Sequence, residues 1–183
     1  MGLKRKCTVG VIIGIVMGSA GTYVSKDCHQ LRFSKRAMEI IGNVEDCRRY
    51  PYKCPAGKLT QGIGHTGKGI ALHQATNEQI ANWFAMDLLD AQNCIEHYVE
   101  DRADIQLPQP IFDATGSFIF NAGCKKFVHS SMYQFLLRGK YVMACHELPK
   151  WIYVTDDGYK HIEQGLVNRR AKEMNLCLTG ISE

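Results

Sequence analysis

The sequence lacks the features that identify the common metal-binding and nucleic-acid-binding proteins. Its eight cysteines form no C-x-x-C pair and no cysteine–histidine cluster at zinc-finger spacing, so we expect no metal and no cofactor. The formal net charge is +4, but Lys4, Arg5 and Lys6 supply three of these charges, so residues 7–183 carry only 4 − 3 = +1. This charge is too small and too scattered to predict nucleic-acid binding. No low-complexity segment or internal repeat is visible, and 183 residues suffice for one domain with a short appendage.

Cysteines without metal-binding spacing favour disulfides, and therefore an oxidising compartment. The N-terminus agrees, because residues 7–24 (CTVGVIIGIVMGSAGTYV) contain no charge and follow a basic tip, residues 1–6. The uncharged run is just long enough to span a bilayer, and the basic tip would stay in the cytoplasm while the rest of the chain is exported. The run is only weakly apolar, since four glycines and several small polar residues dilute its aliphatic side chains.

Three interpretations of residues 7–24 are open. A cleaved signal peptide is favoured by composition alone, and Gly18-Ser19-Ala20 satisfies a small-x-small cleavage pattern. A permanent membrane anchor could use Gly10, Gly14 and Gly18 as a helix-packing face. The third interpretation is a segment that enters the membrane and later leaves it.

The pattern after the polar linker of residues 25–34 predicts an α+β, mostly helical domain over residues 35–183. Apolar residues at helical spacing predict a helix from Lys35 to Glu45, and a Gly/Pro-rich stretch with a strand at Leu59–Ile63 predicts a small β-hairpin lobe. Thr76-Asn-Glu-Gln79 is a capping box that opens a long helix. Further helices are predicted over residues 111–122, 130–138, 140–148 and 166–178.

Glu45 is the candidate catalytic acid. It ends an apolar helix face just before the Gly/Pro-rich loop, where partial desolvation suits a carboxylic acid to donate a proton. Cys54, Thr60 and then QGIGH follow it. This spacing resembles the active-site pattern of phage lysozymes, glycoside hydrolase family 24. The resemblance continues in FIFNAG, in Trp151, in NRRA and in CLTG, so it covers roughly residues 33–180.

The resemblance implies the two-lobed phage-lysozyme fold, preceded by one N-terminal membrane segment, and peptidoglycan as the substrate. Glu45 would protonate the glycosidic oxygen, and Thr60 would help to hold the attacking water. Asn121 and Trp151 would line the cleft, although Trp151 could equally be a core residue. Arg170, in NRRA, would bind at the cleft and contact the catalytic glutamate.

Cys54 departs from the pattern, because many members of the family carry aspartate there. The sequence resembles the signal-anchor-release endolysins that have cysteine at this position. In that branch the N-terminal segment is an uncleaved anchor, and a disulfide cages the active-site cysteine until the anchor leaves the membrane. Cys47 could cage Cys54, and Cys7 could then attack Cys47 and expel Cys54 as a thiol. A permanent Cys47–Cys54 staple is the alternative, and Cys28 could replace Cys7 as the attacking thiol.

The resemblance also implies roles for the remaining cysteines and for His65. Structural disulfides would join Cys124 to Cys145 and Cys94 to Cys177. His65 would form an ion pair with Asp87, which falls on the apolar stripe of the long helix. The alternative is a Cys54–His65 nucleophile pair.

Three functions therefore remain open at the level of sequence. The first is a self-releasing muramidase that moves from the inner membrane to the periplasm as a monomer, exported by the Sec machinery and helped indirectly by a phage holin. The second is a peptidoglycan amidase or peptidase that uses Cys54 and His65. The third is a non-enzymatic, membrane-tethered protein that binds peptidoglycan.

Overall fold

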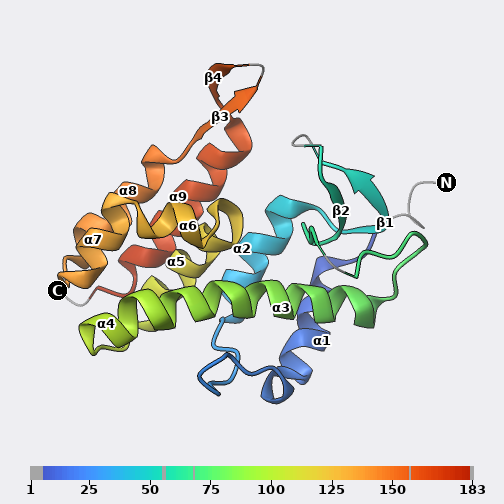
Figure 1. Cartoon of the computed structure of the whole chain (residues 1–183), viewed down its shortest axis with the longest axis horizontal. Helices are drawn as coiled ribbons and strands as arrows, with labels where there is room; N and C mark the ends of the chain where they lie inside the picture. Colours follow the sequence, from blue (N-terminus) through green and yellow to red (C-terminus); the bar gives the residue numbers. More distant parts are fainter. Residues whose placement is uncertain (1–5, 55–56, 68, 157, 182–183) are drawn as a thin grey trace. The chain divides into compact units, whose positions relative to one another are not determined.

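The computed structural model describes residues 6–54, 57–67, 69–156 and 158–181. The predicted basic tip, apart from Lys6, lies outside these residues. The chain divides into two units, residues 1–90 and 91–183, and helix α3 (Asn77–Ile95) crosses the boundary between them (Figure 1). Each unit has its own buried side chains.

The predicted membrane segment forms a short helix that packs against the first unit. Helix α1 (Val9–Gly18) is followed by one 3₁₀ turn (Ala20–Thr22), and it buries Ile12, Ile13 and Val16. It contacts helix α2 (Lys35–Glu45), where a Cβ atom on Gly42 would lie only 2.5 Å from Val9 Cγ1. The close approach of the two helices therefore depends on a glycine at position 42.

None of the helices in the described residues combines the length and the hydrophobicity that a bilayer-spanning helix needs.

The predicted helix and hairpin of the first unit are both present. Ser34 begins α2 by accepting a hydrogen bond from the Ala37 N–H at 3.2 Å. Strand β1 (Arg48–Lys53) pairs antiparallel with β2 (Leu59–Gly62), and the register is irregular between Arg48 and Tyr52. Pro51 lies in this irregular stretch, and its missing N–H explains why the ladder is interrupted there.

Helix α3 begins at the capping box that the sequence predicted. The Gln79 N–H donates to Thr76 Oγ1 at 3.2 Å, and the Thr76 N–H donates to Gln79 Oε1 at 2.9 Å. Beyond α3 the helix widens to a π-helical turn (Glu96–Glu100) and ends with α4 (Asp101–Ala103). The π-turn has no counterpart in the predicted pattern.

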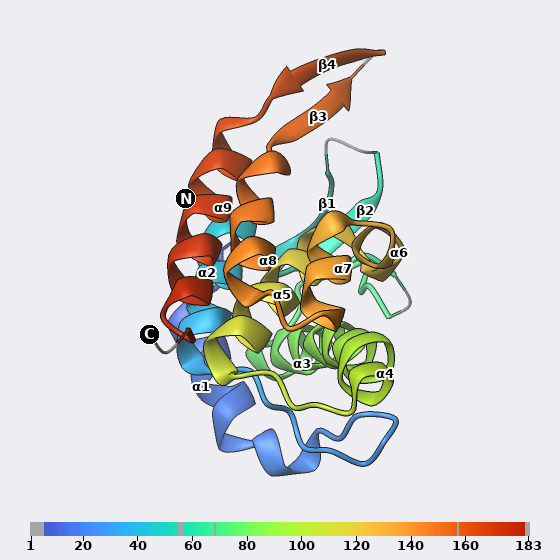
Figure 2. The same cartoon turned by 90° about the vertical axis from the view of Figure 1, so that its left-hand side faces the viewer.

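The second unit is built around helices α5 (Gln109–Ala122) and α9 (Gln164–Leu178), which pack against each other. The remaining elements are α6 (Cys124–Val128), α7 (Ser131–Leu137), α8 (Tyr141–Glu147), a 3₁₀ turn (Leu148–Lys150) and the strands β3 (Tyr153–Asp156) and β4 (Tyr159–Ile162). Figure 2 shows α8 beside α9. The predicted helices 130–138, 140–148 and 166–178 are present with ends shifted by one or two residues.

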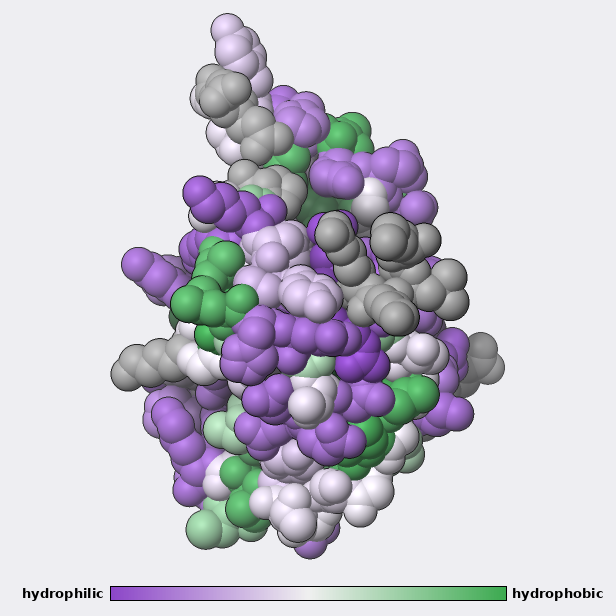
Figure 3. Space-filling model, turned by 90° about the vertical axis from the view of Figure 1, so that its right-hand side faces the viewer, coloured by the Kyte–Doolittle hydropathy of each residue, from purple (hydrophilic) through white to green (hydrophobic). Residues whose placement is uncertain are grey.

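The hairpin of β3 and β4 was not predicted. Its turn contains Gly158 at φ +84°, a conformation that glycine adopts readily, so a turn signal was present in the sequence. Its strands are largely exposed and lack the apolar alternation that identifies a half-buried strand. On the face of the molecule shown in Figure 3, apolar residues likewise form small patches separated by hydrophilic ones.

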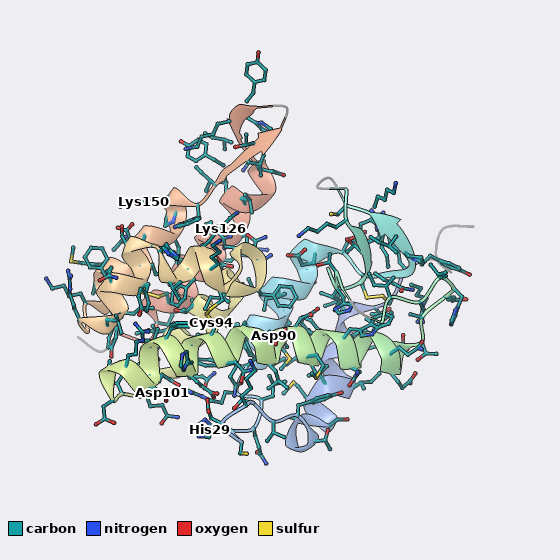
Figure 4. The ribbon with its side chains drawn as sticks, in the orientation of Figure 1. His29, Asp90, Cys94, Asp101, Lys126 and Lys150 are labelled. Atoms are coloured by element: carbon teal, nitrogen blue, oxygen red, sulfur yellow. A yellow bond between two sulfur atoms is a disulfide. The ribbon has the colours of Figure 1, made fainter. Side chains whose placement is uncertain are left out.

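The predicted structural disulfides, Cys124–Cys145 and Cys94–Cys177, were wrong. Cys94 on α3 bonds Cys124 at the start of α6, and Cys145 on α8 bonds Cys177 on α9 (Figure 4 labels Cys94). The Cα–Cα distances are 5.9 and 5.7 Å, within the usual range for a disulfide. Four cysteines allow three connectivities, and only the packing of α8 on α9 brings Cys145 to Cys177.

The contact between α1 and α2 predicts opposite outcomes for one substitution at two glycines. Gly42→Leu should push α1 off α2 and lower the Tm by several degrees, because overpacking a buried site costs about 1–3 kcal/mol. Gly10→Leu should leave the Tm unchanged or raise it, since a Cβ atom there meets nothing within 4 Å. Thermal unfolding and thermolysin cleavage within residues 9–24 measure both effects. Equal protection of the two variants would show that α1 is not held at Gly42.

Candidate active site

Glu45 is the last residue of α2, and a residue with positive φ ends the helix directly after it. Asp46 has φ +56° and ψ 154°, which lies outside the left-handed helical region and is strained for a residue with a Cβ atom. The Glu45 side chain is half-buried. A Cβ atom on Gly64 would lie 3.0 Å from Glu45 Oε2, so the backbone at Gly64 lies directly against the carboxylate. Gly64 also has φ +71°, and both facts require glycine at this position of the QGIGH motif.

The loop that carries Gly64 is held by buried hydrogen bonds. Gln61 is fully buried, and its Nε2 donates to the Arg49 carbonyl at 2.7 Å and to the His73 carbonyl at 3.0 Å. Its Oε1 accepts from the Ala71 N–H at 2.9 Å. Gln61 was not recognised as a site residue, because its role depends on carbonyl groups distant in the sequence. It keeps the loop rigid where the loop supports Glu45.

Cys54 and Thr60 lie on the hairpin that follows Glu45. Tyr52 stands opposite Thr60 in the ladder, and alternate strand residues share a face, so Tyr52, Cys54 and Thr60 lie on one face of the hairpin. Cys54 is half-buried, and the Cys54 N–H donates to the Lys58 carbonyl at 2.9 Å. Thr60 is 2 % exposed, and its hydroxyl donates to the same carbonyl at 3.2 Å.

Tyr52 is a site residue that sequence reasoning missed. Burial raises the pKa of Tyr52, the nearby Arg48 guanidinium opposes this shift, and the negative charges of Glu45 and Cys54 add to it. Glu45 and Cys54 are therefore both within electrostatic range of the Tyr52 phenol. The Arg48 guanidinium lies 4.3 Å from the centre of the Tyr52 ring and fixes its orientation. An aromatic residue two positions before Cys54 was the available signal.

The N-terminal segment reaches the turn after Glu45 through a disulfide. Cys7 bonds Cys47, with a Cα–Cα distance of 5.1 Å, and Cys54 retains its thiol. This is the pairing predicted for the released state, whereas the predicted caging bond between Cys47 and Cys54 is not present in this structure. Cys28 is exposed and outside the three disulfides.

Asp46 is held by several donors beside this disulfide. It accepts the Cys47 N–H at 3.0 Å, and Lys6 Nζ and Arg48 Nε each lie 3.3 Å from its second oxygen. Burial alone would raise the pKa of Asp46, but the hydrogen bond from Cys47 and the two cations lower it below its usual value. The strained turn after Glu45 is thus stabilised by local charges.

His65 makes the predicted contact with Asp87. His65 Nδ1 lies 2.9 Å from Asp87 Oδ2 and 3.1 Å from Oδ1, and the His65 side chain is buried. Its ring stacks on Trp83 with a centroid distance of 5.3 Å and an interplanar angle of 6°. Its backbone pairs with Gln61 in both directions. These contacts agree with a structural histidine that holds the Gly64 loop to α3.

In the second unit, the structure brings Asn121, Trp151 and Arg170 together. Arg170 hydrogen-bonds Asn121 Oδ1 through Nη2 and the Trp151 carbonyl through Nε, the latter at 3.2 Å. Phe118 lies under this group, with the Trp151 ring edge-on at 5.0 Å and the Arg170 guanidinium 4.9 Å from its ring centre. The Arg170 side chain is only 2 % exposed, so it positions its two neighbours. Its predicted contact with Glu45, a residue of the first unit, stays a prediction.

Comparison with known proteins assigns this arrangement to a family. The family model for phage lysozyme matches residues 42–173, which include Glu45, Cys54, Thr60 and the Arg170 cluster. The chain belongs to the phage lysozyme family. It is therefore a muramidase, a hydrolase whose substrate is peptidoglycan.

This lysozyme also resembles individual proteins over almost its whole length. The SAR-endolysin of Escherichia phage P1 is 34% identical over 186 residues, which cover 96% of this chain and 92% of that protein. The crystal structure of the active form of the P1 phage endolysin Lyz is similar with a TM-score of 0.80, at 33% identity and 98% coverage of both chains. The secreted inactive form of the same endolysin has a TM-score of 0.56, at 32% identity, and covers 83% of this chain and 99% of that chain. The lysozyme described here is thus more similar to the active form than to the inactive form.

Glu173 is a further residue of the lysozyme's second unit that sequence reasoning missed. It is fully buried and pairs with both arginines of NRRA, accepting from Arg169 Nε at 3.0 Å and from Arg170 Nη1. Ser117 Oγ donates to it at 2.6 Å. The spacing of three and four residues on one helix was the available signal.

Gly64→Ala should reduce turnover strongly, while its free energy of unfolding should fall little more than that of the control Gly139→Ala. The new methyl group meets the Glu45 carboxylate at 3.0 Å, so kcat should fall by about tenfold or more through misplacement of the acid. Gly139→Ala is the matched control, because Gly139 has φ +64° and open space around it. Each should lose roughly 1–2 kcal/mol of stability from the left-handed alanine. Equal kcat values would show that Gly64 does not position Glu45.

His65→Asn should lower the Tm and leave substantial activity at temperatures where the lysozyme is folded. The change removes the hydrogen bond to Asp87, which should cost about 1–3 kcal/mol. His73→Asn, at an exposed histidine, is the control and should change neither quantity. Loss of turnover without loss of stability would assign His65 a catalytic role.

Proposed function

We propose that this lysozyme is an endolysin that cleaves the β-1,4 bond between N-acetylmuramic acid and N-acetylglucosamine. The observation that carries the proposal is the packing of Gly64 against Glu45 at the end of α2, beside a hairpin face with Cys54 and Thr60. A glutamic acid held in this way can protonate the glycosidic oxygen as the bond breaks.

Thr60 and Cys54 would act on the opposite side of the sugar. Because the Thr60 hydroxyl donates its only proton to the Lys58 carbonyl, its remaining lone pairs can accept a hydrogen bond and orient a water. Cys54 occupies the position of the second carboxylate of other glycosidases, and as a thiolate it can stabilise the positive charge or activate that water. Asn121 and Trp151, positioned by Arg170, would bind the glycan.

The family match supports a glycosidase over the amidase or peptidase, because the phage lysozyme model covers the residues around Cys54 and His65. A Cys–His hydrolase needs an imidazole that is oriented toward the thiol. A carboxylate on Nδ1, as Asp87 is on His65, also orients the imidazole of such an enzyme, so this contact does not separate the two functions. The products released from sacculi separate them.

We infer that the protein is exported by the Sec machinery and held first in the inner membrane by residues 7–24, with the basic tip cytoplasmic and residues 35–183 periplasmic. Release into the periplasm, triggered indirectly by a holin, would then precede lysis of the host cell. The Cys7–Cys47 disulfide supports an uncleaved segment, because cleavage after Ala20 would remove Cys7. The similarity to SAR-endolysins supports the same route.

The docking of α1 offsets the cost of moving the segment out of the bilayer, because its apolar side chains stay out of water. Burial of Ile12, Ile13 and Val16 in the first unit is worth roughly 5–9 kcal/mol relative to exposure to water. Gly10, Gly14 and Gly18 add little hydrophobic free energy in the membrane, and a Cβ atom on any of them would meet nothing within 4 Å when α1 is docked. We propose that the segment is stable enough in either place for a small change to move it.

Glu45→Gln should abolish cleavage of purified peptidoglycan sacculi, with a fall in kcat of about 100-fold or more, because it removes the proton donor and keeps the size of the side chain. Glu39→Gln, on the exposed side of the same helix, is the control and should keep full activity. The assay counts new reducing sugar ends and, in parallel, new amino and carboxyl groups.

Three results would contradict the proposal. Near-normal release of reducing ends by a folded Glu45→Gln protein would exclude Glu45 as the acid. Release of amino and carboxyl groups without reducing ends would identify an amidase or peptidase. A protein that binds sacculi and solubilises none of them would be the non-enzymatic tether.

A further inference from the structure

The caging disulfide of the proposed switch offers two sulfur atoms to the attacking Cys7, and the two attacks have opposite consequences. Attack on Cys47 forms the Cys7–Cys47 bond and expels Cys54 as a thiolate. Attack on Cys54 would form a Cys7–Cys54 bond and leave the catalytic position blocked. In either case the Cys7 thiol loses its proton to solvent, one S–S bond forms, one breaks, and the leaving thiolate keeps the electron pair, so no oxidant is needed.

The backbone before α1 is hydrogen-bonded beside Cys47, one of these two cysteines. The Cys7 N–H donates to the Cys47 carbonyl at 3.0 Å, and Lys6 forms an antiparallel bridge with Arg48. Arg49 Nε donates to the Lys6 carbonyl at 3.3 Å. Lys6 and Cys7 therefore extend the edge of β1 in a defined register at its Cys47 end.

Lys6 adds an electrostatic contact to this backbone register. Its Nζ lies 3.3 Å from Asp46 Oδ2, and Asp46 is already held by Cys47 and Arg48. A basic residue that is cytoplasmic before release would thus acquire an acidic partner beside Cys47 only after release.

The paired hairpin also separates the two cysteines of the cage. Arg48 stands opposite Gly62, and Lys53 stands opposite Leu59. Gly62 and Leu59 are three residues apart on β2, and three strand residues span about 10 Å. The two cysteines lie beyond these ends of β1, whereas a disulfide requires Cα atoms within about 7 Å. The paired hairpin is incompatible with the Cys47–Cys54 bond. Formation of the hairpin would therefore draw Cys54 away from Cys47 and prevent the reverse exchange.

We propose that Lys6, docked beside Cys47, directs the Cys7 thiolate to the sulfur of Cys47 and away from the sulfur of Cys54. Lys6 thereby determines the specificity of the exchange and acts as a positioning residue for Cys7. The inference rests on the proposed release mechanism and is independent of the glycosidase chemistry.

The test maps disulfides in the full-length protein with Cys28→Ser, which removes the alternative thiol. Cells holding the protein in the membrane are treated with an uncoupler, quenched in acid at intervals, alkylated, and analysed by peptide mass mapping. Lys6→Glu should lower the ratio of Cys7–Cys47 to Cys7–Cys54 about fivefold and slow its appearance, because the new charge repels Asp46. Lys4→Glu makes the same change in the charge of the N-terminus and should behave as the parent.

A second variant separates the ion pair from general damage to the N-terminus. Asp46→Asn keeps the acceptor for the Cys47 N–H and the size of the side chain, but removes the charge that faces Lys6. Adding Lys6→Glu to Asp46→Asn should then change the ratio less than Lys6→Glu does alone.

Equal ratios and rates for Lys6→Glu and Lys4→Glu would overturn the role of Lys6. Comparable amounts of the two products in the parent would overturn directed exchange altogether. Absence of a Cys47–Cys54 bond before the uncoupler is added would overturn the cage itself, and directed exchange with it. The glycosidase assignment survives all three results, since it is measured on sacculi with Glu45→Gln.

Discussion

The disulfide between Cys7 and Cys47 holds the N-terminal segment against the turn that follows Glu45, and much of the first unit is organised around that connection. It closes a loop of 40 residues, which removes about 4 kcal/mol of chain entropy from the unfolded state. It also keeps α1 next to α2, so that the apolar face of α1 remains covered. The same bond leaves Cys54 as a thiol on the hairpin face beside Thr60.

Two close contacts connect the catalytic turn to the rest of the first unit. Gly64 supports the Glu45 carboxylate from one side, and the Gly64 loop is fixed by Gln61 and by the His65–Asp87 contact with α3. The Gly64 backbone lies directly against the half-buried Glu45 carboxylate, so it transmits small displacements of the loop. A change in the hairpin or in α3 would therefore reach the acid through this loop.

Besides its two disulfides, the second unit contains a buried cluster of charged side chains. Arg169 and Arg170 share Glu173, and the arrangement has no exposed member except Asn121 at its edge. Such pairs are costly to bury and costly to break, because removal of one member leaves an uncompensated charge. The planar guanidinium group of Arg170 is suited to fixing the orientation of Asn121 and of the Trp151 backbone.

The local features could be predicted from residues close together in the chain: the α2 helix and its end at Glu45, the capping box of α3, the hairpin after Glu45, and the spacing that led to the family. These depend on residues close together in the chain, where periodicity, caps and turns act. The disulfide partners of Cys94 and Cys145, the support of Glu45 by Gly64, and the docking of Lys6 beside Cys47 depend instead on the three-dimensional packing. Each of these joins segments many residues apart, and which segments meet is set by the packing of whole helices and strands, which no local pattern encodes.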